Sequence, residues 1–193
     1  MATTEEIKAL RDETGVSIMQ CKKALEEAGG DMAKAKVILR KQSSIAAGKK
    51  ADRVLGAGVA AAYTHAGGAV VGAVVLACET DFVSKNEEFV KLAYNIAMHV
   101  AAMGPQFKSK EDVKESDIAA AREVFEKEAV NVPEVMREKA VAGKIDSYLK
   151  ERVLLEQPYV KDPEITVRVL IDTYVQKFGE KIEVARFERL SVK

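Results

Sequence analysis

The sequence predicts an α+β fold, in which an N-terminal bundle of three helices precedes a core of helices packed on a small antiparallel sheet. Three short segments with helical periodicity fill residues 1–44. Two strand-like runs, at 59–64 and 69–77, flank a pair of glycines. Longer segments with an apolar repeat of three and four residues follow them, as amphipathic helices require. A chain of 193 residues is long enough for one core domain and a small additional domain.

The N-terminal bundle is predicted from its helix boundaries. Thr3 and Glu6 fit a capping box, in which each side chain satisfies the free backbone N–H of the other residue. Ser17, together with Gln20, is expected to cap a second helix, and Asp31 a third. Glycines end the first two segments, because glycine tolerates the left-handed conformation found there. The inward apolar positions are Ile7, Leu10, Ile18, Cys21, Leu25, Ala28, Ala35, Ile38 and Leu39.

A basic linker is predicted at residues 45–56, between the bundle and a core domain at 57–193. The composition changes at Ser43 and becomes rich in glycine, lysine and arginine. A solvated connector is the simpler interpretation of such a stretch. Contact with RNA or with an acidic protein surface is the alternative.

The core sheet is expected to begin as a hairpin, whose turn contains Gly67-Gly68 and needs the positive φ angles that glycine supplies. The second strand, 69–77, is apolar on both alternating faces, which predicts a central strand covered on both sides. A late strand at 182–190 completes the sheet. Its alternation changes phase between Val184 and Phe187, so we expect a β-bulge or a second buried face.

Helices are predicted between these strands. One runs from Ser84 to Met103, with Ser84 and Glu87 as a capping box. Residues 116–153 predict a helical hairpin with Asn131-Val132-Pro133 as its corner, since proline suits a first helical turn. A last helix ends at Gly179.

The chemistry-bearing residues argue against an enzyme. Residues 56–61 match the spacing of a dinucleotide-binding fingerprint, but a strand is expected after them where that site needs a helix. Cys21, His65, Cys78 and His99 are too scattered for a zinc-site spacing. We therefore expect no catalytic residue, no metal and no cofactor.

Composition bounds the partners and the compartment. A formal net charge of zero argues against a whole-chain electrostatic footprint for nucleic acid. The N-terminus does not resemble a signal peptide, and no apolar run approaches the roughly 20 residues of a membrane helix. The two cysteines are interpreted as buried, reduced thiols. We expect a cytoplasmic protein with no membrane partner and no stable nucleic-acid partner.

The segment Cys78-Glu79-Thr80-Asp81-Phe82-Val83-Ser84-Lys85 lies at the corner between the buried strand and the next helix. An acidic residue beside a bulky aromatic residue projects there from a rigid base. We interpret the pair as a wedge and a charge presented to another macromolecule. The alternative is that Phe82 folds back over the core.

Two segments resemble the signatures of the elongation factor Ts family. Residues 10–25 closely resemble its N-terminal signature, and residues 78–85 are similar to its second signature. The segments 96–102 and 156–160 look like further family segments. The family usually has a glutamate and an asparagine where this chain has Val75 and Ala77. With one core half, the chain is similar to the compact members of the family.

The resemblance implies a guanine-nucleotide exchange factor for the translation GTPase elongation factor Tu, which binds the nucleotide-free GTPase and destabilises bound GDP with its Mg²⁺. It also implies a homodimer that pairs core to core, with residues 1–44 as a module that docks on the GTPase. For His99, it implies an approach to the region near the phosphate-binding loop, with partial burial as the structural alternative. The implied wedge consists of Thr80, Asp81, Phe82 and Val83, and the implied contact surface of the N-terminal module consists of Ile18, Met19 and Lys22.

Two functions of other classes stay open. The bundle resembles ubiquitin-associated domains in size and helix pattern, so an adaptor for ubiquitin-like or peptide ligands is conceivable. An RNA-binding module using Lys49, Lys50 and Arg53 is the second, and steep salt dependence of RNA binding would identify it.

Overall fold

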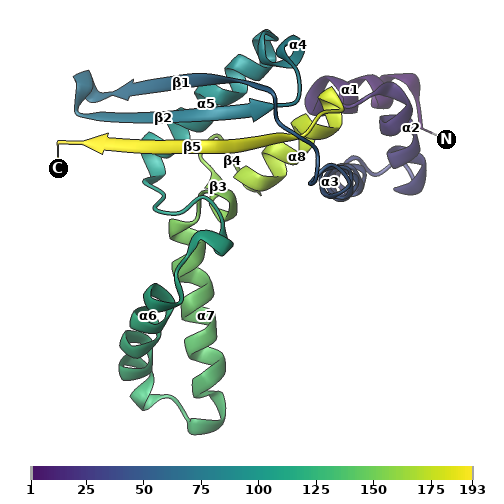
Figure 1. The fold of residues 1–193 in the computed structure, drawn as a ribbon. Coiled ribbons are helices and arrows are strands. Elements are labelled where there is room, and N and C mark those ends of the chain that lie inside the picture. Colours follow the sequence, from purple (N-terminus) through teal and green to yellow (C-terminus); the bar gives the residue numbers. More distant parts are fainter. Residues whose placement is uncertain (1, 193) are drawn as a thin grey trace.

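The computed structural model describes residues 2–192 and confirms the α+β fold (Figure 1). The domain limits predicted at residues 1 and 193 fall outside the described range. Three antiparallel strands form the main sheet in the order β1-β2-β5. The strands are β1 Ala57–His65, β2 Val70–Cys78 and β5 Ile182–Ser191, and the two long helices packed with them in the core are α5 Glu87–Met103 and α8 Val167–Phe178.

The N-terminal bundle forms with the predicted caps. The Glu6 N–H donates to the Thr3 hydroxyl at 3.2 Å, and the Thr3 N–H donates to the Glu6 carboxylate at 2.7 Å. Ser17 and Asp31 cap the next two helices as expected. The helices are α1 Thr4–Thr14, α2 Ile18–Glu27 and α3 Met32–Gly48, and their shared core consists of Leu10, Val16, Cys21, Ala24, Leu25, Ala35 and Leu39.

The linker prediction is wrong for residues 45–48, because α3 continues to Gly48. Tertiary contacts with α8 stabilise this extension. The buried Ser43 hydroxyl contacts Gln176, and the Ser44 hydroxyl donates to the Asp172 carboxylate at 2.7 Å. Burial raises the pKa of Asp172. The end of the bundle is therefore packed against the core.

The β-bulge offered for the late strand is confirmed. β2 pairs Leu76 with Val184 and Val75 with Arg186, which leaves Ala185 as the extra residue on β5. The extra residue shifts the alternation of side chains by one position. Val184 before the bulge and Phe187 after it can therefore both point toward the core. The hairpin turn is also confirmed, because Gly67 and Gly68 have φ of 66° and 100°.

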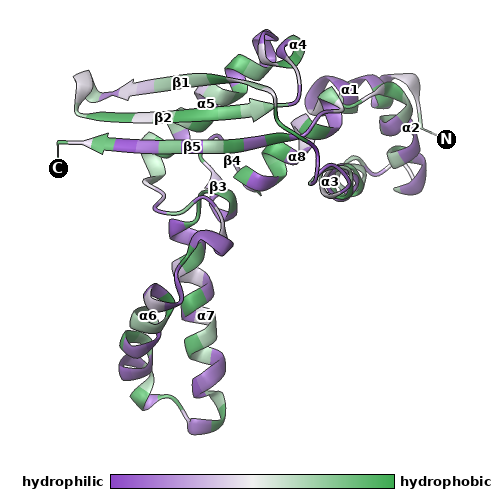
Figure 2. Ribbon diagram, viewed as in Figure 1, coloured by the Kyte–Doolittle hydropathy of each residue, from purple (hydrophilic) through white to green (hydrophobic). Residues whose placement is uncertain are grey.

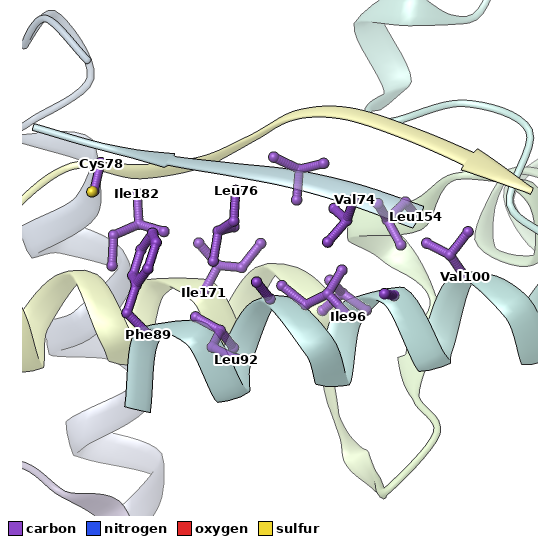
Figure 3. Packing of buried hydrophobic residues seen from close by; sticks show 14 of the residues in the cluster. Val74, Leu76, Cys78, Phe89, Leu92, Ile96, Val100, Leu154, Ile171 and Ile182 are labelled. Carbon is purple, nitrogen blue, oxygen red and sulfur yellow. The ribbon is translucent and has the colours of Figure 1, made fainter. Parts of the chain in front are cut away.

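The prediction that β2 is covered on both faces holds for one face only. Figure 2 shows β2 hydrophobic along its length. Val74 and Leu76 are buried under α5, as Figure 3 shows, whereas Val75 on the other face is 39% exposed. A strand that is apolar on both faces is unfavourable to expose on either one. The pattern does not indicate whether this chain or a second molecule buries each face.

Gly72 lies where α5 comes very close to the sheet. A Cβ atom built on Gly72 would stand 2.2 Å from the carbonyl oxygen of Ala97 and 2.6 Å from the backbone nitrogen of Ala101. Both atoms belong to the helix backbone, which cannot rotate away. The absence of a side chain at this position therefore sets the distance between helix and sheet.

The helix predicted from Ser84 begins later, and its capping box is wrong. The corner first forms a single turn, α4 Asp81–Ser84, in which the Ser84 hydroxyl donates to the Asp81 carbonyl at 3.1 Å. Asn86 then caps α5, because its side chain accepts the Glu88 N–H at 2.9 Å. Two capping residues close together in the sequence offered two possible helix starts.

The predicted helical hairpin forms and projects away from the core (Figure 1). Its helices are α6 Glu115–Glu128 and α7 Glu134–Arg152, with Pro133 at the N-cap of the second. The sequence did not predict a second sheet of two short strands, β3 Pro158–Tyr159 and β4 Asp162–Thr166. Short 3₁₀ turns complete the fold at Ala66–Gly68, Lys110–Asp112, Ala129–Asn131 and Leu154–Glu156. Between residues 2 and 192, no helix is both long and apolar enough to cross a membrane.

Candidate partner-binding corner

The corner between β2 and α5 presents Phe82 to solvent. Phe82 is 82% exposed, while its neighbour Val83 is 3% exposed and belongs to the core. Successive residues of a helical turn point about 100° apart, so one can anchor the turn while the other projects. The structure therefore excludes the alternative in which Phe82 covers the core. It places Val83 beneath the surface that Phe82 forms.

Asp81 adds a negative charge beside this ring. Its exposed carboxylate accepts from the Lys85 ammonium at 2.6 Å. That hydrogen bond and the lysine charge lower the pKa of Asp81, so the carboxylate is ionised at neutral pH. Since both side chains are about three-quarters exposed, the ion pair can exchange its partners.

Residues far away in the sequence hold this corner, and sequence reasoning missed them. Glu180, in the turn between α8 and β5, accepts hydrogen bonds from the backbone of Glu79 and Thr80. Arg53, which the sequence offered as an RNA contact, donates instead to the Glu79 carboxylate at 3.2 Å. About a hundred residues separate Glu180 from the corner, so no local pattern could reveal the contact.

The residues expected to form the contact surface of the N-terminal module lie together at the start of α2. Ile18 is 53% exposed and Met19 is 73% exposed, so the inward position predicted for Ile18 is wrong. The side chain of Lys22 is half exposed and lies 3.9 Å from Glu26. Figure 1 shows the bundle and α4 at the same end of the sheet.

His99 is completely buried, which goes beyond the partial burial of the structural alternative. Its Nδ1 accepts the backbone N–H of Val160 at 3.2 Å, and its Nε2 lies 2.9 Å from the Gln157 side-chain oxygen. An accepting Nδ1 carries no proton, so Nε2–H is the donor to Gln157. Gln157 in turn donates to the carbonyl of Glu151 at 2.7 Å. The ring thus joins α5 to the segment that follows α7.

Acid is expected to destabilise the fold through His99. Burial lowers the pKa of His99, whereas an unfolded histidine titrates near about 6.5. As the pH falls below that value, the unfolded state binds more protons than the folded state, so the free energy of unfolding decreases, by at most about 1.4 kcal/mol per pH unit for one proton.

Chemical denaturation between about pH 8 and pH 5 checks this expectation. The unfolding free energy of His99→Gln should depend less steeply on pH than that of the native protein. The matched control is His65→Gln, which replaces the other histidine of the chain at an exposed position. Equal slopes for the native protein and His99→Gln would contradict the assignment.

Comparisons with known proteins point to one family. The protein-family model described as Elongation factor TS matches residues 48–192. A protein of Moorella thermoacetica named Elongation factor Ts is 44% identical over 194 residues, which cover 100% of this chain and 96% of that protein. One of Thermotoga petrophila with the same name is 44% identical over 186 residues, covering 96% and 94% of the two chains. One of Desulforamulus reducens, also so named, is 46% identical over 185 residues, covering 95% and 85%.

Proposed function

Because this chain belongs to the elongation factor Ts family, we propose that it is a guanine-nucleotide exchange factor that promotes release of GDP from elongation factor Tu. The observation that carries the proposal is the exposure of Phe82 on a corner whose next residue is anchored in the core. Such a factor makes and breaks no covalent bond. It acts as a surface complementary to the nucleotide-free GTPase.

Exchange would proceed by insertion of the corner next to the Mg²⁺ site of the GTPase. Mg²⁺ requires near-ideal octahedral coordination, so a small displacement of its ligands weakens its binding and that of GDP. Phe82 supplies the bulk, Asp81 supplies the charge, and Thr80 and Val83 hold the turn that presents them. The coupling is reciprocal, because the factor weakens GDP binding as much as GDP weakens binding of the factor.

The N-terminal bundle, residues 1–44, is proposed to dock on the GTPase. Ile18 and Met19 provide exposed apolar area for this contact, and Lys22 provides a charge at its edge. His99 would then contribute through the segment it holds, at Gln157 and Val160, and not by touching the partner. The proposed compartment is the cytoplasm, where elongation factor Tu acts.

The test is release of fluorescently labelled GDP from purified elongation factor Tu, with excess unlabelled GDP, in the presence and absence of this protein. Acceleration that rises with the protein concentration and saturates supports exchange activity. A release rate that does not change at any concentration refutes it. RNA binding with steep salt dependence, together with unchanged GDP release, would favour the nucleic-acid alternative.

The exposed face of the sheet is proposed to pair with a second copy of the chain. This face contains a hollow of about 360 Å³. The alanines of β1 that line the hollow have small side chains, so they do not fill it. Arg186 and Glu188 form an ion pair at its border, with a separation of 3.1 Å. In a twofold arrangement the same patch meets itself, so each arginine can also reach the glutamate of the other copy. The residues lining the hollow are Ala60, Ala61, Ala62, Ala73, Val74, Val75, Arg186, Phe187 and Glu188. Among them, Ala61, Val74 and Phe187 pack against the core on the opposite face.

Val75→Arg is expected to separate the dimer into monomers, because it would bury an unpaired charge at the centre of the pairing face. Sedimentation at micromolar concentration should show twice the chain mass for the native protein and the single chain mass for the variant. Val124→Arg is the matched control, since Val124 is exposed on α6, away from this face. A native protein that sediments as a single chain would refute the pairing.

A further inference from the structure

Glu180 accepts three hydrogen bonds from Glu79 and from Thr80, the first residue of the wedge. One carboxylate oxygen accepts the backbone N–H of Glu79 at 3.1 Å and that of Thr80 at 3.0 Å. The other oxygen accepts the Thr80 hydroxyl at 2.6 Å. A carboxylate can accept several donors at once, and charged acceptors form the stronger hydrogen bonds. The backbone just before Asp81 is therefore held from outside its own segment.

A carboxylate of the corner also binds the backbone of the α8–β5 turn. The Glu79 carboxylate accepts the backbone N–H of Lys181 at 2.5 Å and lies 3.2 Å from the Arg53 guanidinium. The hydrogen bond from Lys181 is the main cause of a lowered Glu79 pKa, followed by burial, which acts in the other direction, and by Arg53. Each of the two adjacent segments thus offers a carboxylate to the backbone of the other. Such a reciprocal clasp restricts sliding as well as separation.

The clasp acts where the wedge has little support of its own. α4 is a single turn, and its N-cap residue, Thr80, uses its hydroxyl to reach Glu180. An isolated helical turn is unstable in water, because nucleation fixes several dihedral angles for few hydrogen bonds. Val83 anchors the turn from below, but one buried side chain leaves rotation of the turn possible. The hydrogen bonds that Thr80 donates to Glu180 remove that freedom.

We propose that Glu180 is a positioning residue for exchange, which acts through Thr80 to hold Phe82 and Asp81 in the orientation that enters the GTPase. The proposal rests on the exchange function proposed above. It gives the α8–β5 turn a role in GDP release although Glu180 is not itself a wedge residue. An ordered wedge binds more favourably than a mobile one, because a mobile turn loses conformational entropy when it inserts into the GTPase.

The test measures labelled GDP release from elongation factor Tu as a function of factor concentration, which separates the maximal rate from the half-saturating concentration. Glu180→Ala should lower the maximal rate at least tenfold and change the half-saturating concentration less than threefold, because docking through the N-terminal bundle is intact. Glu180→Gln keeps an oxygen for the two N–H groups and an amide for the Thr80 hydroxyl, so it should retain most of the rate. Glu123→Ala, which removes an exposed partner of Lys127 on α6, is the matched control and should behave as the native protein does.

A double-mutant cycle with Phe82→Ala distinguishes positioning from a general loss of structure. If Glu180 acts through Phe82, the maximal rate of the double variant should be less than twofold below that of Phe82→Ala alone. Amide hydrogen exchange should increase at residues 79–84 and stay unchanged in the N-terminal bundle. If Glu180→Ala fails to fold, Thr80→Val provides the same cycle, because it removes only the 2.6 Å bond.

The outcomes distinguish the positioning role of Glu180 from the exchange function on which it rests. If the native protein does not accelerate GDP release, the exchange function is refuted, and the positioning role with it. If the native protein is active while Glu180→Ala matches it in maximal rate, only the positioning role is overturned. The same holds if Glu180→Ala lowers the rate equally with and without Phe82.

Discussion

Replacement of Phe82 by alanine is expected to leave the protein folded and to lower the maximal rate of GDP release about 30-fold or more. The ring is 82% exposed, so its removal leaves no cavity and should change the free energy of unfolding by about 0.5 kcal/mol or less. A buried phenylalanine would cost about 3–5 kcal/mol instead. The effect on the rate follows from a central aromatic contact, which contributes at least about 2 kcal/mol at an interface.

Thermal unfolding and GDP release measured on the same Phe82→Ala sample check both parts. Val83→Ala is the matched contrast, since Val83 is buried and its truncation should cost about 1.5–3 kcal/mol of stability. Val135→Ala removes an exposed apolar side chain on α7 and should affect neither quantity. A folded Phe82→Ala with undiminished exchange would remove Phe82 from the mechanism.

Gly72→Ala is expected to have the largest effect on stability, about 3 kcal/mol or more. The new Cβ would meet the Ala97 carbonyl oxygen at 2.2 Å and the Ala101 nitrogen at 2.6 Å. Neither backbone atom can move without shifting α5 from the sheet, which separates the side chains that fill the core. Overpacking at sites with rotatable neighbours costs about 1–3 kcal/mol, and this site has less room to adjust.

Thermal unfolding measures this effect, because a loss of 3 kcal/mol lowers Tm by about 6–12 °C in a chain of this length. Gly143→Ala is the matched control: among the described residues, no heavy atom outside the local helix backbone lies within 4 Å of a Cβ built there. Gly143 lies within α7, so alanine should stabilise that variant by up to about 1 kcal/mol through helix propensity. An unchanged Tm for Gly72→Ala would show that α5 can shift freely.

Much of the architecture could be predicted from the sequence because its determinants are local. A capping box needs only residues three positions apart, so Thr3 and Glu6 defined the first helix start correctly. The change of phase between Val184 and Phe187 indicated a bulge or a second buried face, because a strand has a period of two, and the structure contains the bulge. The corner was recognised for a similar reason, since strand and helix patterns meet there within a few residues.

Other features depended on residues that meet only in the folded chain. The helical state of residues 45–48 follows from contacts of Ser43 and Ser44 with α8, more than 120 residues away. The exposed face of β2 and the buried place of His99 depend on which elements the chain lays over them. Glu180 lies 100 residues from Thr80. Hydrophobic periodicity and capping chemistry act over a few residues, so the sequence alone determined most of the elements and the corner. Long-range packing decided the end of α3 and which side chains are covered, exposed or held by distant residues.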